Sequence, residues 1–358
     1  MKSKFLVAQL GSPLSTKISD VRNYLREFLG DPRVVDSKSI VWKLVLYLFV
    51  LPFRPRKSAK AYSYIWDGHS FPLVSITNSL VAKMSKLLVK SNMLNNEIEV
   101  ESVFLLSHPR VKNIFQQWNN ESENTRAQEV WVFPQFPQYA ESTIASVFDV
   151  LAKELKNQIN IPHLHFISGF HRFKPFIDLS VEHIHHVLKQ NDIDALMISF
   201  HGIPLRRVLS KKDLYYKHCI ETFFLLTAQI KFPAEKIFLC FQSRFGREPW
   251  LGPSTELVAD DLVKMGKKRI AVYCPSFVVD CLETTVEIGV ELREHIAGNG
   301  GEIISIPCLN DFDPWAEALT SLIIDLKKQG LVALENKSYQ INENSFSNFL
   351  LKYPPRSS

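Results

Sequence analysis

The chain has 358 residues, 46% of them hydrophobic, so it can bury a large core, and at this length one core normally gives way to two domains. The formal net charge is +5, but lysines and arginines are spread along the chain, and no basic run with interleaved aromatics indicates a nucleic-acid-binding surface. The cysteines form no C-x-x-C pair and no zinc-type spacing, which is typical of a protein in a reducing cytosol; they are Cys219, Cys240, Cys274, Cys281 and Cys308.

The first apolar stretch, in "MKSKFLVAQLGSP", is too short for a signal peptide, so we expect a cytoplasmic protein. The most apolar segment is "VWKLVLYLFVLPF", residues 41–53, which Lys43 interrupts and which falls short of the roughly 20 residues needed to span a bilayer. Two interpretations stay open for this segment. It forms either a buried helix ended by Pro52, or an exposed apolar lip that takes up an apolar ligand or touches a membrane surface.

Short β-rich runs alternate with helical patterns along the chain, which favours parallel sheets joined by right-handed crossovers. The runs are "KFLVAQL", "IEVESVFLL", "EVWVFPQF", "HLHFISGF", "IDALMISFH", "KIFLCFQ", "KRIAVYCP" and "GEIISIPCL". They fall into two sets of four with a boundary near residue 170, and each set opens with a strand that ends in Gly-x-Pro, at "LGSP" and "HGIP". We therefore predict two similar α/β halves, followed from about residue 336 by a polar, peripheral tail.

Common cofactor and nucleophile signatures are missing from the sequence. There is no G-x-G-x-x-G after a strand, no G-x-x-x-x-G-K-[ST] and no G-x-S-x-G. Dinucleotide redox chemistry, P-loop phosphate chemistry and serine hydrolysis therefore lose their usual support.

A buried-strand pattern ends at a histidine in "MISFHGIPLRR", residues 197–207. Gly202 and Pro204 prevent the strand from continuing, so His201 is predicted at the carboxyl end of a strand, the edge where open α/β sheets bind ligands. The simpler interpretation is a structural histidine that is hydrogen-bonded to nearby backbone.

A carboxylate row is predicted in "CPSFVVDCLETTVEIGVELREHIAGNGG". The apolar periodicity indicates a helix from Val278 to Ala297, on which Glu283, Glu287 and Glu291 lie at i, i+4 and i+8. Like-charge neighbours in that arrangement cost roughly 0.2 to 0.5 kcal/mol each. The row is either a solvated face or a site for a cation or a path for protons.

Six motifs resemble the ferrochelatase family, in family order and at family-like spacing between about residues 5 and 330. They are "LGSP…VRNYLREFLGDPRVVD", "FPQFPQYAEST", "ISFHGIP", "DLYYKHC", "FQSRFGREPWLGP" and "CPSFVVDCLETTVEI". The resemblance implies two Rossmann-like lobes, each a four-stranded parallel sheet flanked by helices. The N-terminal lobe would span residues 1–170 and carry the lip at 41–53, and the C-terminal lobe would span 171–335, with the tail at 336–358.

The resemblance also implies a reaction, the insertion of Fe(II) into protoporphyrin IX to make haem. On that likeness His201 and Glu283 are the catalytic pair assigned to iron, and Glu287 and Glu291 form a conduit for protons or metal. Porphyrin contacts are expected from Ser12, Pro13, Tyr139, Gln242, Ser243 and Trp250. Iron would be a substrate, the tail has no cysteines for an iron–sulfur cluster, and contact with a membrane surface would be peripheral.

The chain departs from the family pattern in its first half. Leu105 and Leu106 stand where the family usually carries an Arg-Tyr pair, and Gln9 stands where Asn is usual. These changes bear on the choice of porphyrin or on catalytic efficiency. Two further functions therefore stay open: a chelatase for another tetrapyrrole or metal, such as coproporphyrin III, and a porphyrin or haem carrier without turnover.

Overall fold

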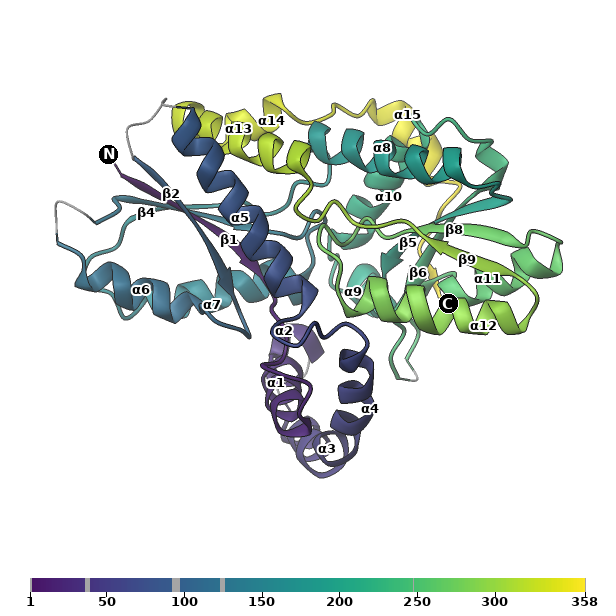
Figure 1. Ribbon diagram of the computed structural model, residues 1–358, viewed down its shortest axis with the longest axis horizontal. Coiled ribbons are helices and arrows are strands. Elements are labelled where there is room, and N and C mark those ends of the chain that lie inside the picture. Colours follow the sequence, from purple (N-terminus) through teal and green to yellow (C-terminus); the bar gives the residue numbers. More distant parts are fainter. Residues whose placement is uncertain (1, 36–38, 92–96, 123–125, 247, 358) are drawn as a thin grey trace. The chain divides into compact units, whose positions relative to one another are not determined.

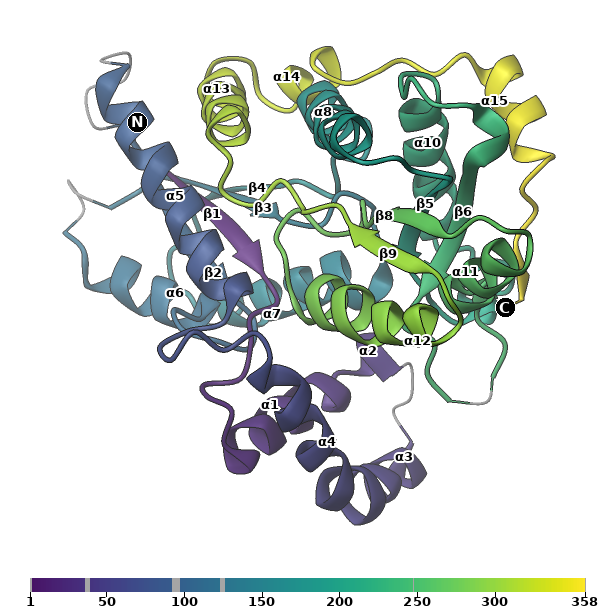
Figure 2. The ribbon, with the colours of Figure 1, turned by 45° about the vertical axis from the view of Figure 1, so that its right-hand side comes forward.

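The structure is a computed structural model that describes every residue except 1, 36–38, 92–96, 123–125, 247 and 358 (Figures 1 and 2). The chain forms two compact units. The first comprises residues up to 169 together with 311–333, and the second comprises residues 170–310 and 334–358. Each unit holds one four-stranded sheet, and every strand pair in these two sheets is parallel.

The sheet of the first unit has the strand order β2-β1-β3-β4. Its strands are β1 (Ser3–Gln9), β2 (Ile98–Phe104), β3 (Glu129–Pro134) and β4 (His163–Phe166). Leu6 and Ala8 alternate with Phe5 and Val7, so one face of β1 packs in a core with helices α6 (Val111–Asn120) and α7 (Ser146–Leu155). Helix α5 (Pro72–Lys90) contacts β1 and β2 on the other face (Figure 2).

The sheet of the second unit has the equivalent order β6-β5-β8-β9. Its strands are β5 (Ala195–His201), β6 (Ile237–Gln242), β8 (Arg269–Tyr273) and β9 (Glu302–Ser305). One face shares a core with α11 (Thr255–Lys264), the π-helix η4 (Glu283–Leu292) and α12 (Arg293–Gly298). The other face meets α8 (Lys174–Gln190), where the Tyr273 hydroxyl donates to Ser180 Oγ at 2.7 Å, and α8 packs on α10 (Tyr215–Thr227). The eight predicted strands and the two-sheet α/β fold are confirmed.

Residues 311–333 belong to the first unit, although the sequence pattern assigned them to the second half. Helix α13 (Asp313–Gln329) packs on α5, and Lys327 Nζ donates to Glu129 Oε2 and to Ser3 Oγ, both at 2.7 Å. Glu129 opens β3 and Ser3 opens β1, so a lysine on α13 ties this helix to the amino ends of two strands.

The last residues of the chain pack on the second unit. Helix α14 (Val332–Asn336) is followed by α15 (Glu343–Leu350), whose Phe346 and Phe349 make edge contacts with Phe224 of α10. Beyond α15, β10 (Arg356–Ser357) pairs antiparallel with the short strand β7 (Leu251–Gly252). The remaining short helices are α9 (Leu205–Leu209), η2 (Glu141–Ala145) and η3 (Ala234–Lys236).

A group of helices lies together beyond the carboxyl end of β1 (Figure 1). It comprises α1 (Ile18–Gly30), α2 (Pro32–Val35), α3 (Ile40–Val45), η1 (Leu46–Val50) and α4 (Leu51–Ser63). The prediction that Pro52 ends a helix is wrong, because Pro52 lies in the first turn of α4, where its missing N–H would have no intrahelical partner. The chain passes from α3 through η1 directly into α4.

Candidate active site

His201 is the last residue of β5, at the carboxyl edge of the second sheet. Its backbone is fixed from two sides, because its N–H donates to Ser276 Oγ at 3.2 Å and its carbonyl accepts from the Tyr215 hydroxyl at 2.7 Å. At Gly202 a Cβ would lie 2.6 Å from the Gln242 carbonyl oxygen, so only glycine fits where β5 and β6 part. The prediction that His201 ends a strand is therefore correct.

The imidazole of His201 is partly exposed, but its Nδ1 atom is buried and has no hydrogen-bond partner among the described residues. The ring meets Phe277 edge-on, with 6.0 Å between the two centroids. Burial lowers the pKa of His201, and the nearby charge of Glu283 opposes that shift. The imidazole is therefore neutral at pH 7 and has a lone pair with which to accept a proton or bind a metal.

Glu283 is the first residue of η4 and lies close enough to His201 for its charge to act on the imidazole. The predicted helix begins later than Val278, because residues 274–281 form turns and loop, and it is a π-helix over Glu283–Leu292. Gln242 at the end of β6 holds its start: its side-chain amide donates to the Glu283 carbonyl at 3.0 Å. The Gln242 Oε1 atom in turn accepts from Ser199 Oγ at 2.9 Å and from Cys274 Sγ at 3.2 Å.

Glu287 lies one turn further along η4 and is bound by Ser243, the residue after β6. The Ser243 N–H donates to Glu287 Oε1 and the Ser243 hydroxyl donates to Glu287 Oε2, both at 2.6 Å. Ser243 reaches both oxygens from a left-handed backbone conformation with φ of 67°. Burial raises the pKa of Glu287 to about 7, the bonds from Ser243 oppose the rise, and the charge of Glu283 adds to it.

The carboxylate row runs outward to solvent: Glu283 and Glu287 are partly buried, and Glu291 is exposed. A π-helix bonds each residue to the one five positions on, and such turns occur frequently at functional sites. The row therefore leads from the exposed Glu291 to Glu283, the member whose charge acts on His201.

The sequence singled out neither Tyr215 nor Ser276, which hold the backbone of His201 and share a further hydrogen bond of 2.9 Å. Their only signal in the sequence was that both lie within motifs that carry the resemblance. Trp250 is also near His201, because a Cβ on Gly202 would lie 3.3 Å from the Trp250 ring.

The other predicted porphyrin contacts lie in the first unit. Ser12 and Pro13 follow β1, and a single hydroxyl, Ser107 Oγ, accepts from the Ser12 N–H and donates to the Ser12 carbonyl, both at 2.7 Å. Gly11 precedes them with φ of 94°, and a Cβ there would lie 2.4 Å from Ser107 Oγ. Tyr139 follows β3 and is partly exposed, just before η2.

The residues that depart from the family pattern lie near this strand end. Leu105 is buried in the core of the first unit, and the Leu106 N–H donates to the Leu10 carbonyl at 2.9 Å. Gln9 is buried and its Oε1 accepts from the Leu10 N–H at 3.0 Å. This strand end is therefore lined by apolar and amide side chains at the positions where the family usually has Arg, Tyr and Asn.

The lip segment, residues 41–53, is largely exposed. Leu46 and Leu51 are buried, whereas the exposed large side chains are Val41, Leu44, Tyr47, Leu48, Phe49 and Phe53. From Ser39 to Trp66 the sequence has no Asp or Glu, and its basic residues are Lys43, Arg54, Arg56, Lys57 and Lys60. Of the two interpretations, an exposed lip fits better than a buried helix. Among the described residues no helix is long and apolar enough to cross a membrane.

Within the described part of the chain no three His, Cys, Asp or Glu side chains are grouped so as to hold a metal ion. All five cysteines are buried thiols outside any disulfide. A metal ion bound by His201 and Glu283 would therefore need further ligands from a bound substrate or from water.

The chain is an α/β protein with two similar parallel-sheet units, and His201 and a row of glutamates lie at the carboxyl edge of the second sheet. The ferrochelatase family profile matches residues 2–326. A ferrochelatase from Herminiimonas arsenicoxydans is 36% identical over 90% of this chain and 86% of its own length. A coproporphyrin III ferrochelatase from Streptococcus mutans is 34% identical over 89% of this chain and 96% of its own. The chain belongs to the ferrochelatase family, and its enzyme class is that of the metal chelatases.

Among solved structures, SirB from Bacillus subtilis with Fe3+ aligns with 91% of this chain and 95% of its own, at a TM-score of 0.49 and 12% sequence identity.

Proposed function

We propose that this protein inserts Fe(II) into protoporphyrin IX and releases two protons. The observation that carries the proposal is the His201 imidazole, which is neutral and has a ring nitrogen without a hydrogen-bond partner among the described residues. It lies at a strand end beside Glu283 in a member of the ferrochelatase family. In this proposal His201 and Glu283 are the catalytic residues and the iron-binding pair.

The reaction needs a base and a means to hold a cation. Two pyrrole N–H protons must leave while Fe(II) takes their place, so the charge of the macrocycle and the metal balances in the product. A neutral imidazole near pH 7 can accept one of these protons, and its lowered pKa favours passing the proton on. The Glu283 carboxylate supplies the opposite charge that attracts the ferrous ion.

Glu287 and Glu291 complete the proposed path between Glu283 and solvent. With a pKa of about 7, Glu287 exchanges a proton readily at neutral pH, and the exposed Glu291 returns it to water. Gln242 and Ser243 hold the first two members of the row, so their contact with porphyrin would be secondary to this positioning role.

The apolar lip and its basic residues suit a porphyrin, which has apolar faces and carboxylate side chains. The same absence of acidic residues from Ser39 to Trp66 suits an anionic membrane surface, and we propose peripheral contact of the lip with such a surface. The buried, unpaired thiols support a cytoplasmic location.

The second candidate is a chelatase for coproporphyrin III. It is favoured by the relative from Streptococcus mutans, a coproporphyrin III ferrochelatase that is 34% identical to this chain. Purified protein would be given Fe(II) anaerobically with protoporphyrin IX or coproporphyrin III, and the product followed by its visible absorbance. A higher kcat/KM with protoporphyrin IX supports the proposal, and a higher value with coproporphyrin III reassigns the substrate. Porphyrin binding without metal insertion would identify a carrier instead.

A further inference from the structure

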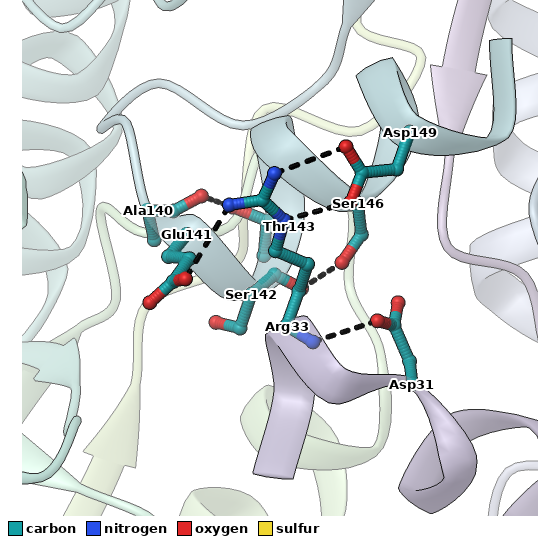
Figure 3. Close-up of polar contacts among 8 residues, drawn as sticks. All are labelled: Asp31, Arg33, Ala140, Glu141, Ser142, Thr143, Ser146 and Asp149. Atoms are coloured by element: carbon teal, nitrogen blue, oxygen red, sulfur yellow. Dashed lines mark hydrogen bonds and ion pairs between the residues drawn. The ribbon is translucent and has the colours of Figure 1, made fainter. Parts of the chain in front are cut away.

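Arg33 joins two parts of the first unit that are far apart in sequence. It lies on α2, between α1 and the lip, and its guanidinium contacts two acids on the helix that follows β3 (Figure 3). Arg33 Nε donates to Asp149 Oδ2 at 2.7 Å, and Nη2 donates to Asp149 Oδ1 at 3.0 Å. Nη1 also reaches Glu141 Oε1 at 3.4 Å.

The two acids lie on either side of a change in helix type. Glu141 is the first residue of the π-helix η2, and Asp149 is in the first turn of α7, which continues the same helix. At the start of η2 the Thr143 N–H donates to the Ala140 carbonyl at 3.2 Å. The guanidinium therefore spans the π-to-α junction, as Figure 3 shows, and Glu141 lies two residues after Tyr139.

No residue of the four-residue helix α2 is fully buried, and α2 lies against both α1 and η2, so the bonds from Arg33 add polar contacts to a partly exposed interface. The bonds to Asp149 raise the pKa of Arg33, so the guanidinium stays charged. An exposed ion pair contributes little stability, but a two-point Arg–carboxylate contact fixes direction as well as distance. The contact is thus suited to set where α2 and η2 lie relative to each other.

We propose that Arg33 is a positioning residue for porphyrin binding: by tying α2 to η2 and α7, it holds the lip and the Tyr139 loop in register. This inference rests on the proposed function, because it assumes that the lip and Tyr139 both contact porphyrin. It differs from the roles of His201 and Glu283 in predicting an effect on porphyrin affinity and none on the chemical step.

The test compares Arg33→Met, Arg33→Lys and Asp149→Asn with the wild type. A matched control is Arg269→Met, which breaks the Arg269 to Glu302 pair in the second unit. Its side chains are 39% and 52% exposed, close to 36% and 47% for Arg33 and Asp149. Porphyrin Kd is measured by fluorescence without iron, and KM for each substrate and kcat are measured with both.

We expect Arg33→Met and Asp149→Asn to raise porphyrin Kd and KM by about three- to fivefold, the upper range for loss of one exposed pair. The value of kcat and the KM for iron should stay within about twofold of the wild type, because the transition-state contacts are unchanged. Arg33→Lys keeps the charge but loses the two-point contact, so it should restore part of the affinity. Adding Asp149→Asn to Arg33→Met should cause little further loss.

Equal porphyrin Kd values for Arg33→Met, Arg269→Met and the wild type would overturn the inference, as would a fall in kcat that matches the rise in Kd. If Arg33→Met fails to fold, Arg33→Lys and Asp149→Asn decide the question by the same measurements. A wild-type protein that binds no porphyrin would instead refute the proposed function.

Discussion

The hydroxyl of Ser243 offers a direct way to shift the titration of Glu287. Ser243→Ala removes the bond from Ser243 Oγ to Glu287 Oε2 and leaves the backbone bond to Oε1 in place. A hydrogen bond to a charged group contributes about 1.5 to 3 kcal/mol, and one pKa unit corresponds to about 1.4 kcal/mol. Because Glu287 is only partly buried and water can replace the hydroxyl, we take the lower end, about one unit.

The sign follows from the state that the bond stabilises. The hydroxyl donates to the carboxylate, so its removal favours the protonated form and raises the pKa of Glu287 from about 7 to about 8. If turnover needs the carboxylate, the acid limb of the kcat profile moves up by about one pH unit, and at pH 7 kcat falls about fivefold.

The assay measures kcat from pH 5.5 to 9.5 for the wild type, Ser243→Ala and Ser243→Gly. Glycine lacks the hydroxyl but accepts φ of 67° without strain, so it separates the hydrogen bond from the backbone effect. Both variants should show the same shift. An acid limb that stays in place in both, or that moves in the alanine variant alone, would refute the reasoning.

Further predictions concern the carboxylates and the lip. Glu283→Gln should lose most activity, because the amide keeps the shape but cannot attract a cation, and unchanged turnover at every iron concentration would disprove this role. Glu287→Gln with Glu291→Gln should slow turnover without altering porphyrin Kd, whereas superimposable kcat profiles would leave Glu283 acting alone. The raised pKa of Glu287 contributes a loss of stability as the pH rises from about 4.5 to about 7, and urea titrations at several pH values should show that this contribution is missing from the double variant. Leu46→Glu should destabilise the protein by about 3 kcal/mol or more, because Leu46 is buried. Leu48→Glu should keep the melting temperature and weaken porphyrin or liposome binding, because Leu48 is exposed. Equal melting temperatures for the two lip variants would contradict the burial of Leu46.

The strands could be predicted because each is a short apolar run that ends at a turn signal. Ser199 was the one polar residue in the run before His201, and it is buried with its hydroxyl bonded to Gln242 and Thr255. A buried polar residue with such hydrogen-bond partners is compatible with a strand, so the strand was predicted correctly despite Ser199. The position of His201 followed from Gly202, whose need for close approach the structure explains.

The π-helices could not be predicted from the sequence. Apolar spacing in "ETTVEIGVEL" fits an α-helix as well, and the bonds that hold this segment from outside come from residues about 40 positions earlier, Gln242 to the Glu283 carbonyl and Ser243 to Glu287. Pro52 is a second example. It lies in the first turn of α4, directly after the π-helix η1, and no local sequence pattern indicates that η1 is a π-helix. The grouping of α13 with the first unit rests on contacts between residues far apart in sequence: α13 packs on α5, and the partners of Lys327 are about 200 and 320 residues away.

The most direct test of the account is anaerobic insertion of Fe(II) into protoporphyrin IX by the wild type and by His201→Ala. Product is followed by visible absorbance, and porphyrin binding is followed by fluorescence. The account predicts haem formation by the wild type, and for His201→Ala near-normal porphyrin binding with turnover lowered by about 100-fold or more, the range expected for loss of a catalytic base. Near-normal turnover by His201→Ala would contradict the account.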